Sequence, residues 1–159
     1  MSARWLRRKM VNPILDLLRQ GVTPEKIALS IALGFTLGVT PVLGSTSMLC
    51  FLAAVLLRLN LPAIQLVNFS VYPLQFVLLV PFIRVGEWIF AAPPVRITPG
   101  EILGLIRADV WHAITTLWTT TIHALVAWLA LGSLAALATY TLLTPLLKRL
   151  SESLRAGPH

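Results

Sequence analysis

Three long apolar runs dominate the hydrophobic pattern of this chain, at about residues 27–57, 61–90 and 118–147. Each run exceeds the ~20 residues that a helix needs to cross the hydrocarbon core of a bilayer. The first and third runs contain no Asp, Glu, Lys or Arg. The pattern predicts an all-α integral membrane protein, with broken or re-entrant transmembrane helices and amphipathic helices at the membrane boundary.

The first run begins with a helix start signal and is interrupted near its middle. Thr23 suits the N-cap and Pro24 suits the first turn, ahead of the apolar residues. Four helix-breaking residues then fall within eleven positions, and hydroxyl side chains that can satisfy freed backbone groups follow: Gly34, Gly38, Pro41 and Gly44, then Ser45, Thr46 and Ser47. The spacing predicts two helical halves with an unwound joint near residues 40–44.

The second run is interrupted as well, and it ends with two charges. A polar break containing Arg58 and Asn60 precedes it, and polar residues and prolines recur along it: Asn68, Ser70, Tyr72, Pro73, Gln75 and Pro81. Arg84 and Glu87 lie three apart near its end and can pair on one helix face. We expect this run to form a re-entrant hairpin, while 27–57 forms one broken crossing and 118–147 one full crossing.

The segments outside the apolar runs are basic or amphipathic. Residues 1–26 predict a basic N-terminal segment that lies as a helix at a headgroup boundary. Residues 99–117 predict an interfacial helix, and residues 148–159 a basic cytoplasmic tail with a disordered end. Because both ends are basic, the positive-inside rule places both termini in the cytoplasm, which requires an even number of crossings.

Composition and charge agree with a membrane protein and exclude other classes. The chain is 57% hydrophobic and 12% charged, whereas soluble domains are ~45–50% apolar and ~25% charged. Its net charge of +7 lies mostly at the two ends, which favours anionic headgroups over nucleic acid as the partner. No cleavable signal peptide is apparent, so the first run itself is expected to direct membrane insertion. The single cysteine, Cys50, excludes an intrachain disulfide.

The interrupted runs are the first candidate for function. Paired segments broken by glycine and proline form ion or solute sites in transporters, because non-helical backbone at membrane depth must be buried or line a cavity. The alternative is that Gly34 and Gly38 form a helix-packing motif and Pro41 is a tolerated kink. The sequence leaves both interpretations open.

Charged and polar residues supply two more candidates. Arg58, Arg84 and Glu87 either lie along a pathway or mark the ends of membrane segments. A polar stripe recurs at three- and four-residue steps: Asp109, His112, Thr116, Thr119, Thr120 and His123. Asp109 can orient His112 for acid–base chemistry, but the wetter face of an interfacial helix explains the stripe more simply. Neither metal nor cofactor is expected, because no ligand cluster or nucleotide-binding motif is present.

Three short segments resemble a known bacterial family. Residues 33–44 (LGFTLGVTPVLG), 57–62 (LRLNLP) and 71–74 (VYPL) are similar to the small membrane family catalogued as domain of unknown function 2062. The resemblance fades after about Gly86, and Tyr72 stands before Pro73 where the family usually has Asn. Some members are fused to glycosyltransferase domains, which implies a setting in envelope polysaccharide or lipid-linked sugar metabolism.

These features lead to one main hypothesis and two alternatives. We expect a non-enzymatic protein of the bacterial inner membrane that binds or translocates a lipid, a lipid-linked sugar or a small solute, and that forms a homo-oligomer or joins a membrane partner. Its candidate residues are Gly34, Gly38, Pro41, Gly44, Ser45, Thr46, Arg58, Asn60, Asn68, Tyr72, Pro73, Arg84 and Glu87. The alternatives are a structural subunit of a membrane assembly that docks through the Gly34–Gly38 face, and a membrane enzyme that uses Asp109 and His112.

Overall fold

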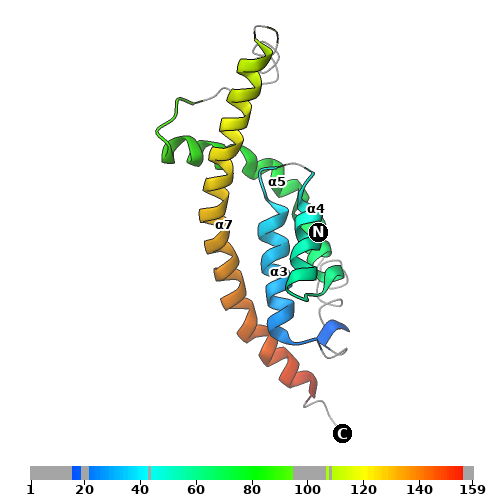
Figure 1. The fold of residues 1–159 in the computed structure, drawn as a ribbon. Coiled ribbons are helices and arrows are strands. Elements are labelled where there is room, and N and C mark those ends of the chain that lie inside the picture. The colour runs from blue at the N-terminus through cyan, green and yellow to red at the C-terminus, as the bar shows by residue number, and fades with distance from the viewer. Residues whose placement is uncertain (1–15, 19–21, 43, 95–106, 108, 156–159) are drawn as a thin grey trace.

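The computed structural model describes residues 16–18, 22–42, 44–94, 107 and 109–155. Its helices are α3 (Pro24–Gly38), α4 (Thr46–Leu56), α5 (Leu61–Ile89) and α7 (Val110–Arg155), and the described residues contain no strand. Helices α3 and α4 lie antiparallel beside the first half of α5, and α7 runs along the whole length of the bundle (Figure 1). The described part of the chain is therefore all-helical, as predicted.

The predicted joint in the first run is present between α3 and α4. The Thr23 hydroxyl accepts a hydrogen bond from Lys26 N at 3.4 Å and caps α3, which ends at Gly38. The expectation of one broken crossing is wrong, because the chain reverses at the joint and the run forms a helical hairpin (Figure 1). At 15 and 11 residues, α3 and α4 are roughly 22 and 16 Å long, so neither alone spans a ~30 Å hydrocarbon core.

The second run forms one continuous helix of 29 residues, so the re-entrant hairpin predicted at 61–90 is wrong. Asn60, a candidate site residue, is its N-cap and accepts a hydrogen bond from Ala63 N at 2.9 Å. Pro73 and Pro81 lie inside the helix, where each removes one backbone donor without ending it. Helix α5 changes course along its length and passes beside α7 in its second half (Figure 1).

Helix α3 packs against α5 through the two glycines of the first run. A Cβ atom on Gly34 would lie 2.7 Å from the Ile64 carbonyl oxygen and 2.9 Å from Val67 Cβ. A Cβ atom on Gly38 would lie 3.1 Å from Asn68 Oδ1. The two helices approach this closely only because the glycines lack side chains, so the Gly-x-x-x-Gly pattern is a packing motif within the chain.

Helix α7 is longer than the sequence suggested. It is continuous from Val110 to Arg155, with Pro145 inside it. The predicted division between an interfacial helix at 99–117 and a crossing at 118–147 is therefore absent within the described residues, although 99–106 lie outside them. The expectation of a disordered end from Ser151 is wrong as far as Arg155, because the helical hydrogen-bonding pattern continues through these residues.

The N-terminal end of α3 and the C-terminal part of α7 lie at the same end of the bundle. Lys148 Nζ is 2.8 Å from Glu25 Oε1, and the hydrogen bond from this ammonium lowers the pKa of the Glu25 carboxyl. Leu17 and Leu18, at the described edge of the N-terminal segment, pack against the cluster of Ile27, Ala28 and Leu147. The start of α3 and the C-terminal part of α7 are thus joined by an ion pair and an apolar cluster.

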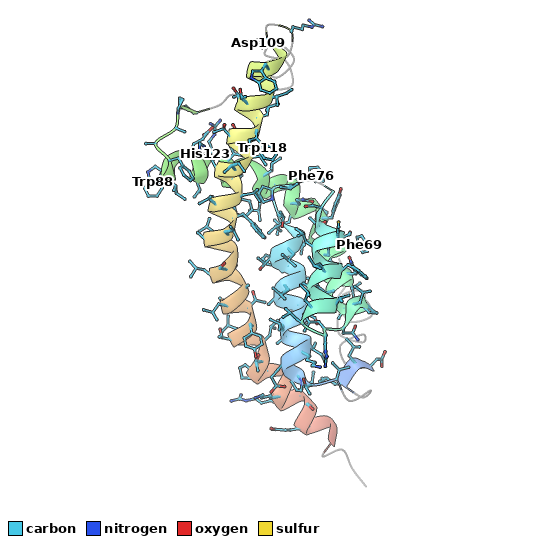
Figure 2. All side chains as sticks on the ribbon, in the orientation of Figure 1. Phe69, Phe76, Trp88, Asp109, Trp118 and His123 are labelled. Carbon is cyan, nitrogen blue, oxygen red and sulfur yellow. The ribbon has the colours of Figure 1, made fainter. Side chains whose placement is uncertain are left out.

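Much of the outer surface is apolar. Leu61–Ile89 and Ile114–Ser153 are long and apolar enough to cross a membrane, and only 28% and 22% of the residues in their most apolar stretches are buried. Phe69, Phe76 and Trp88 project from the bundle (Figure 2). A helix in the core of a soluble protein would bury such side chains, so this surface is compatible with a membrane protein.

Candidate functional site: a polar pocket between α5 and α7

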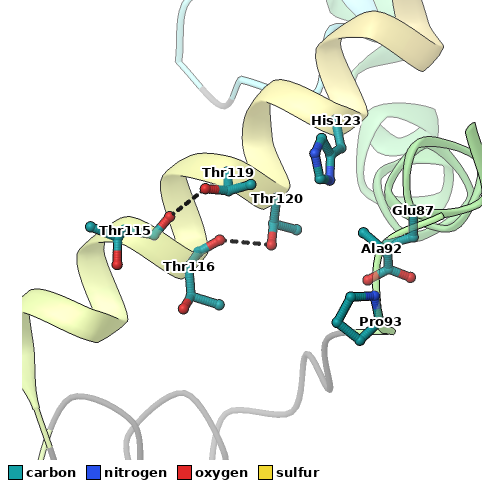
Figure 3. Close-up of a pocket in the computed structure, with 8 residues that line it drawn as sticks. All are labelled: Glu87, Ala92, Pro93, Thr115, Thr116, Thr119, Thr120 and His123. Carbon is teal, nitrogen blue, oxygen red and sulfur yellow. Dashed lines mark hydrogen bonds between the residues drawn. The ribbon is translucent and has the colours of Figure 1, made fainter. Parts of the chain in front are cut away.

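A pocket of about 230 Å³ lies where the end of α5 meets α7 (Figure 3). Glu87 from α5 and His123 from α7 point into it from its two sides. The remaining lining residues come from the chain after α5 and from one face of α7: Ala92, Pro93, Thr115, Thr116, Thr119 and Thr120. The pocket thus gathers a carboxylate, an imidazole and several hydroxyl groups between two helices whose outer surfaces are apolar.

The pocket exists because the backbones of α5 and α7 touch at one residue. A Cβ atom on Gly86 would lie 2.5 Å from the His123 carbonyl carbon and 3.0 Å from Ala124 N. Real Cβ atoms do not approach backbone this closely, so only glycine fits at the crossing. The crossing places Glu87, the next residue of α5, opposite His123.

The Glu87 carboxylate is buried and paired. Glu87 is 5% exposed, and its Oε2 accepts a hydrogen bond of 2.8 Å from Arg84 Nη1. The Arg84 side chain is 47% exposed. The predicted pairing of these residues on one helix face is confirmed, and the guanidinium offsets part of the cost of removing the carboxylate from solvent.

Three of the threonines that line the pocket, Thr115, Thr119 and Thr120, donate their hydroxyl protons within α7. Thr119 Oγ1 donates to Thr115 O at 2.8 Å, and Thr120 Oγ1 donates to Thr116 O at 2.8 Å. A hydroxyl group has one proton and two lone pairs, so these groups offer acceptors to a ligand. This back-bonding also allows hydroxyl groups to lie on an apolar helix without an unsatisfied donor.

The rest of the pocket wall is held by the end of α5. The Phe90 ring stacks on the His123 imidazole, with centroids 4.3 Å apart and planes 15° from parallel. Ala91 then takes the left-handed conformation, with φ of 48°, and Ala92 N donates to Glu87 O at 2.9 Å. This turn closes the helix in the manner of a Schellman motif and brings Ala92 and Pro93 over the pocket.

Replacing Ala91 with glycine is expected to stabilise the protein by about 1 kcal/mol. The left-handed conformation at this position costs a residue with a Cβ roughly 1–2 kcal/mol, and part of that gain is lost to the greater freedom of glycine in the unfolded chain. The free energy of unfolding in detergent micelles measures the effect. A lower stability of the Ala91→Gly variant would contradict this account of the helix end.

The structure joins two of the three groups of candidates from the sequence. Glu87, which is paired with Arg84, meets the second half of the polar stripe, and four residues of the stripe line the pocket: Thr116, Thr119, Thr120 and His123. By itself the stripe is explained most simply as the wetter face of an interfacial helix, and the carboxylate that faces it on α5 is 29 or more residues away in sequence. Asp109 lies at the far end of α7, where its Oδ1 accepts from Trp111 N at 2.9 Å (Figure 2). The side chain of His112 lies outside the described residues, so the enzyme hypothesis stays a prediction.

The candidates of the helix break form a separate and buried group. Gln75 Nε2 donates to the Thr40 carbonyl at 2.7 Å, and Gln65 Nε2 donates to the Ser47 carbonyl at 2.9 Å. Asn68 Nδ2 reaches Ser47 Oγ at 3.2 Å. The Gln75 amide therefore occupies a backbone carbonyl that follows α3, while Gln65 and Asn68 tie the first turn of α4 to α5, so these groups serve the fold.

The remaining candidates lie on the surface or at the joint. Gly44 is exposed with φ of 85°, a conformation that favours glycine, and Ser45 Oγ donates to Val42 O at 2.9 Å. Tyr72 and Pro73 are exposed on the outer side of α5, and Arg58 is exposed just after α4, with φ of 52°. None of these residues lines the pocket at Glu87.

One contact that the sequence did not suggest joins α7 to the break. Trp128 Nε1 donates to the Thr36 carbonyl at 2.9 Å, and Thr36 Oγ1 donates to the Gly132 carbonyl at 3.4 Å. The sequence signal was a tryptophan in the middle of an apolar run, away from the interfacial positions where tryptophan is usual. Within the described residues, no three His, Cys, Asp or Glu side chains lie close enough to hold a metal ion.

Fold and pocket together define a helical bundle with a lipid-compatible surface and a small pocket that contains Glu87 and His123. The chain belongs to the family described as "Uncharacterized protein conserved in bacteria" (DUF2062), which it matches over residues 7–155. The resemblance noted in the sequence is confirmed, but its expected fading after Gly86 is wrong, because the match continues through α7. No curated protein and no solved structure matches the chain.

Proposed function

We propose that this protein is a small multi-pass protein of the bacterial inner membrane that binds the headgroup of a lipid or a lipid-linked solute in the pocket at Glu87 and His123. One observation carries the proposal: a pocket with a mostly apolar wall that places a carboxylate, an imidazole and threonine hydroxyls within an apolar surface. Small-molecule pockets usually measure ~300–1,000 Å³, so a pocket of about 230 Å³ accommodates a headgroup, while the chains of the lipid stay outside.

The surroundings of the pocket suit the apolar part of such a ligand. Trp88, Phe90 and Trp118 are exposed near the pocket, and Trp88 is 82% exposed. Tryptophan is enriched at membrane boundaries, where its ring contacts both chains and headgroups. A lipid whose headgroup enters the pocket can therefore lay its chains along the outer faces of α5 and α7.

The charges favour an orientation for the protein. Lys26, Arg58, Lys148 and Arg149 belong to the end of the bundle where α3 begins and α7 finishes, which is the cytoplasmic end under the positive-inside rule. His123 precedes Lys148 by 25 residues of α7, or roughly 38 Å of helix, which exceeds the ~30 Å hydrocarbon core. The pocket would then face the periplasmic leaflet, with both termini in the cytoplasm.

The packing of α3 supports binding over the structural-subunit alternative. That alternative used the Gly34–Gly38 face as a docking surface, and α5 covers this face. Translocation would require the hairpin of α3 and α4 to move relative to α5, which would break the hydrogen bonds of Gln75 and Gln65. Binding at the pocket requires no such change.

Filling the pocket is expected to remove bound lipid. Thr119→Phe places a ring where the exposed hydroxyl lines the pocket, and lipid retention on the purified protein should fall about tenfold or more. Native mass spectrometry from detergent micelles counts the lipids that remain bound. Thr141→Phe is the matched control, because Thr141 is exposed on the same helix, bonds back to Leu137 O at 2.9 Å and lies outside the pocket. Equal retention by both variants would rule out the pocket as the lipid site.

A further inference from the structure

The polar groups of the pocket are mostly acceptors. The Glu87 carboxylate has no proton to donate when ionised, and the hydroxyl protons of Thr119 and Thr120 are used within α7. A neutral imidazole at His123 adds one acceptor and one donor. A ligand that brings its own N–H or O–H donors can add hydrogen bonds to these lone pairs, whereas a ligand made only of acceptors cannot.

Two opposite charges lie at the pocket, and they occupy different positions. Glu87 places a negative charge on the pocket wall, and its partner Arg84 places a positive charge on the exposed side of the same helix turn. A ligand with a positive group in the pocket and a negative group outside it would meet the opposite charge at both positions.

Resting on the proposed function, we propose that the ligand is a zwitterionic phosphoethanolamine headgroup. Its ammonium group enters the pocket and donates its three N–H bonds to Glu87 Oε1 or Oε2 and to the hydroxyl oxygens of Thr119 and Thr120. Its phosphate stays at the mouth, beside the exposed guanidinium of Arg84. A membrane lipid carries this headgroup, and its chains lie against the apolar surface around Trp88 and Phe90.

Two other headgroup chemistries fit less well. A phosphocholine headgroup carries the same charges, but its quaternary nitrogen has no N–H donor, so it cannot form hydrogen bonds with the acceptors of the pocket. A phosphoglycerol headgroup has hydroxyl donors, but it is anionic overall and its phosphate has no ammonium to pair with Glu87. The lining therefore selects for donors and for positive charge at once.

The test compares short-chain lipids that differ only in the headgroup. The full chain is purified in a polyoxyethylene detergent, which has few hydrogen-bond donors, and titrated with dihexanoyl phosphatidylethanolamine, phosphatidylcholine and phosphatidylglycerol. Tryptophan fluorescence reports binding, since Trp88 and Trp118 lie near the pocket. The ethanolamine lipid is expected to bind about tenfold more tightly than either of the others.

Two variants in the pocket and one control variant outside it test whether the pocket causes the lipid preference. Glu87→Gln should reduce the preference to about threefold or less, and because Glu87 is buried, Thr119→Val serves as a second variant that keeps the shape of the side chain. Thr119→Val should weaken the ethanolamine lipid about threefold, whereas Thr141→Val, the same change outside the pocket, should leave its affinity unchanged.

Each contrary result has a distinct meaning. Equal binding of the three lipids would overturn the headgroup assignment and leave the proposed function standing. Binding of free O-phosphoethanolamine as tightly as the lipid would overturn the assignment of a lipid as the source of the group. Binding of none of the lipids by folded protein would overturn both the assignment and the proposed function.

Discussion

Replacing Gly86 with alanine is expected to destabilise the protein by roughly 2–4 kcal/mol and to abolish the pocket. The new Cβ atom would overlap the His123 carbonyl and lie 3.0 Å from Ala124 N. Both are backbone groups of α7, which cannot rotate away as a side chain can, so the two helices must separate. Separation would expose the apolar cluster of Val39, Phe82, Ile83 and Ala124, which lies at the same crossing.

The effect of Gly86→Ala has two measurable parts. The free energy of unfolding in detergent reports the loss of packing, and lipid retention reports the loss of the pocket. Ser70→Thr is a suitable control, because it also adds one methyl group to α5, at an exposed position whose hydroxyl bonds to Leu66 O at 2.7 Å. A Gly86→Ala protein as stable as the control would show that α5 and α7 do not meet as described.

The sequence predicted local features of this fold well. The cap at Thr23 and the cluster of glycines around Pro41 are local signals, and each specifies the backbone within a few residues of itself. The sequence marks Asn60 only as part of a polar break, and its role as the N-cap of α5 comes from the structure. A proline in a long apolar run predicts a helix end less reliably than these signals do. Pro41 lies beside two glycines and ends a helix, whereas Pro73 lies among helix-compatible residues and does not, so the two runs exchanged their expected roles as hairpin and single helix.

The pocket could not be predicted from the same signals. It depends on Gly86, a single glycine in a run where glycine is common, and on His123, which belongs to a different helix. Sequence reasoning found both Glu87 and the stripe of Thr116, Thr119, Thr120 and His123 as separate groups. Which groups meet is decided by how α5 turns toward α7, and that turn is a property of packing across the whole bundle.

Replacing Gln75 with methionine is expected to lower the free energy of unfolding by about 1–2 kcal/mol. Methionine has nearly the shape of glutamine, so the change removes polar groups with little change in packing. It takes away the donor that reaches the Thr40 carbonyl at 2.7 Å, and that carbonyl belongs to a residue only 2% exposed. An unsatisfied buried acceptor costs ~1–3 kcal/mol.

A second consequence of Gln75→Met opposes the first. Gln75 Oε1 is itself buried with no hydrogen-bond partner within the described residues, and methionine removes this atom. The loss at the Thr40 carbonyl is the larger of the two effects, so the free energy of unfolding still falls. The helix break leaves this carbonyl no intrahelical partner, whereas the amide oxygen was unsatisfied before the change.

The loss of stability should be larger for side chains of α5 that are more deeply buried. Gln65→Met also removes an amide donor, to Ser47 O, but Gln65 is only partly buried and Ser47 lies in the first turn of α4, so a smaller loss is expected. Ser70→Ala, at an exposed position, should have almost none. Chemical denaturation of the three variants in the same detergent gives the order directly. If Gln75→Met were as stable as Ser70→Ala, the amide side chains of α5 would not be what holds the break between α3 and α4 in place.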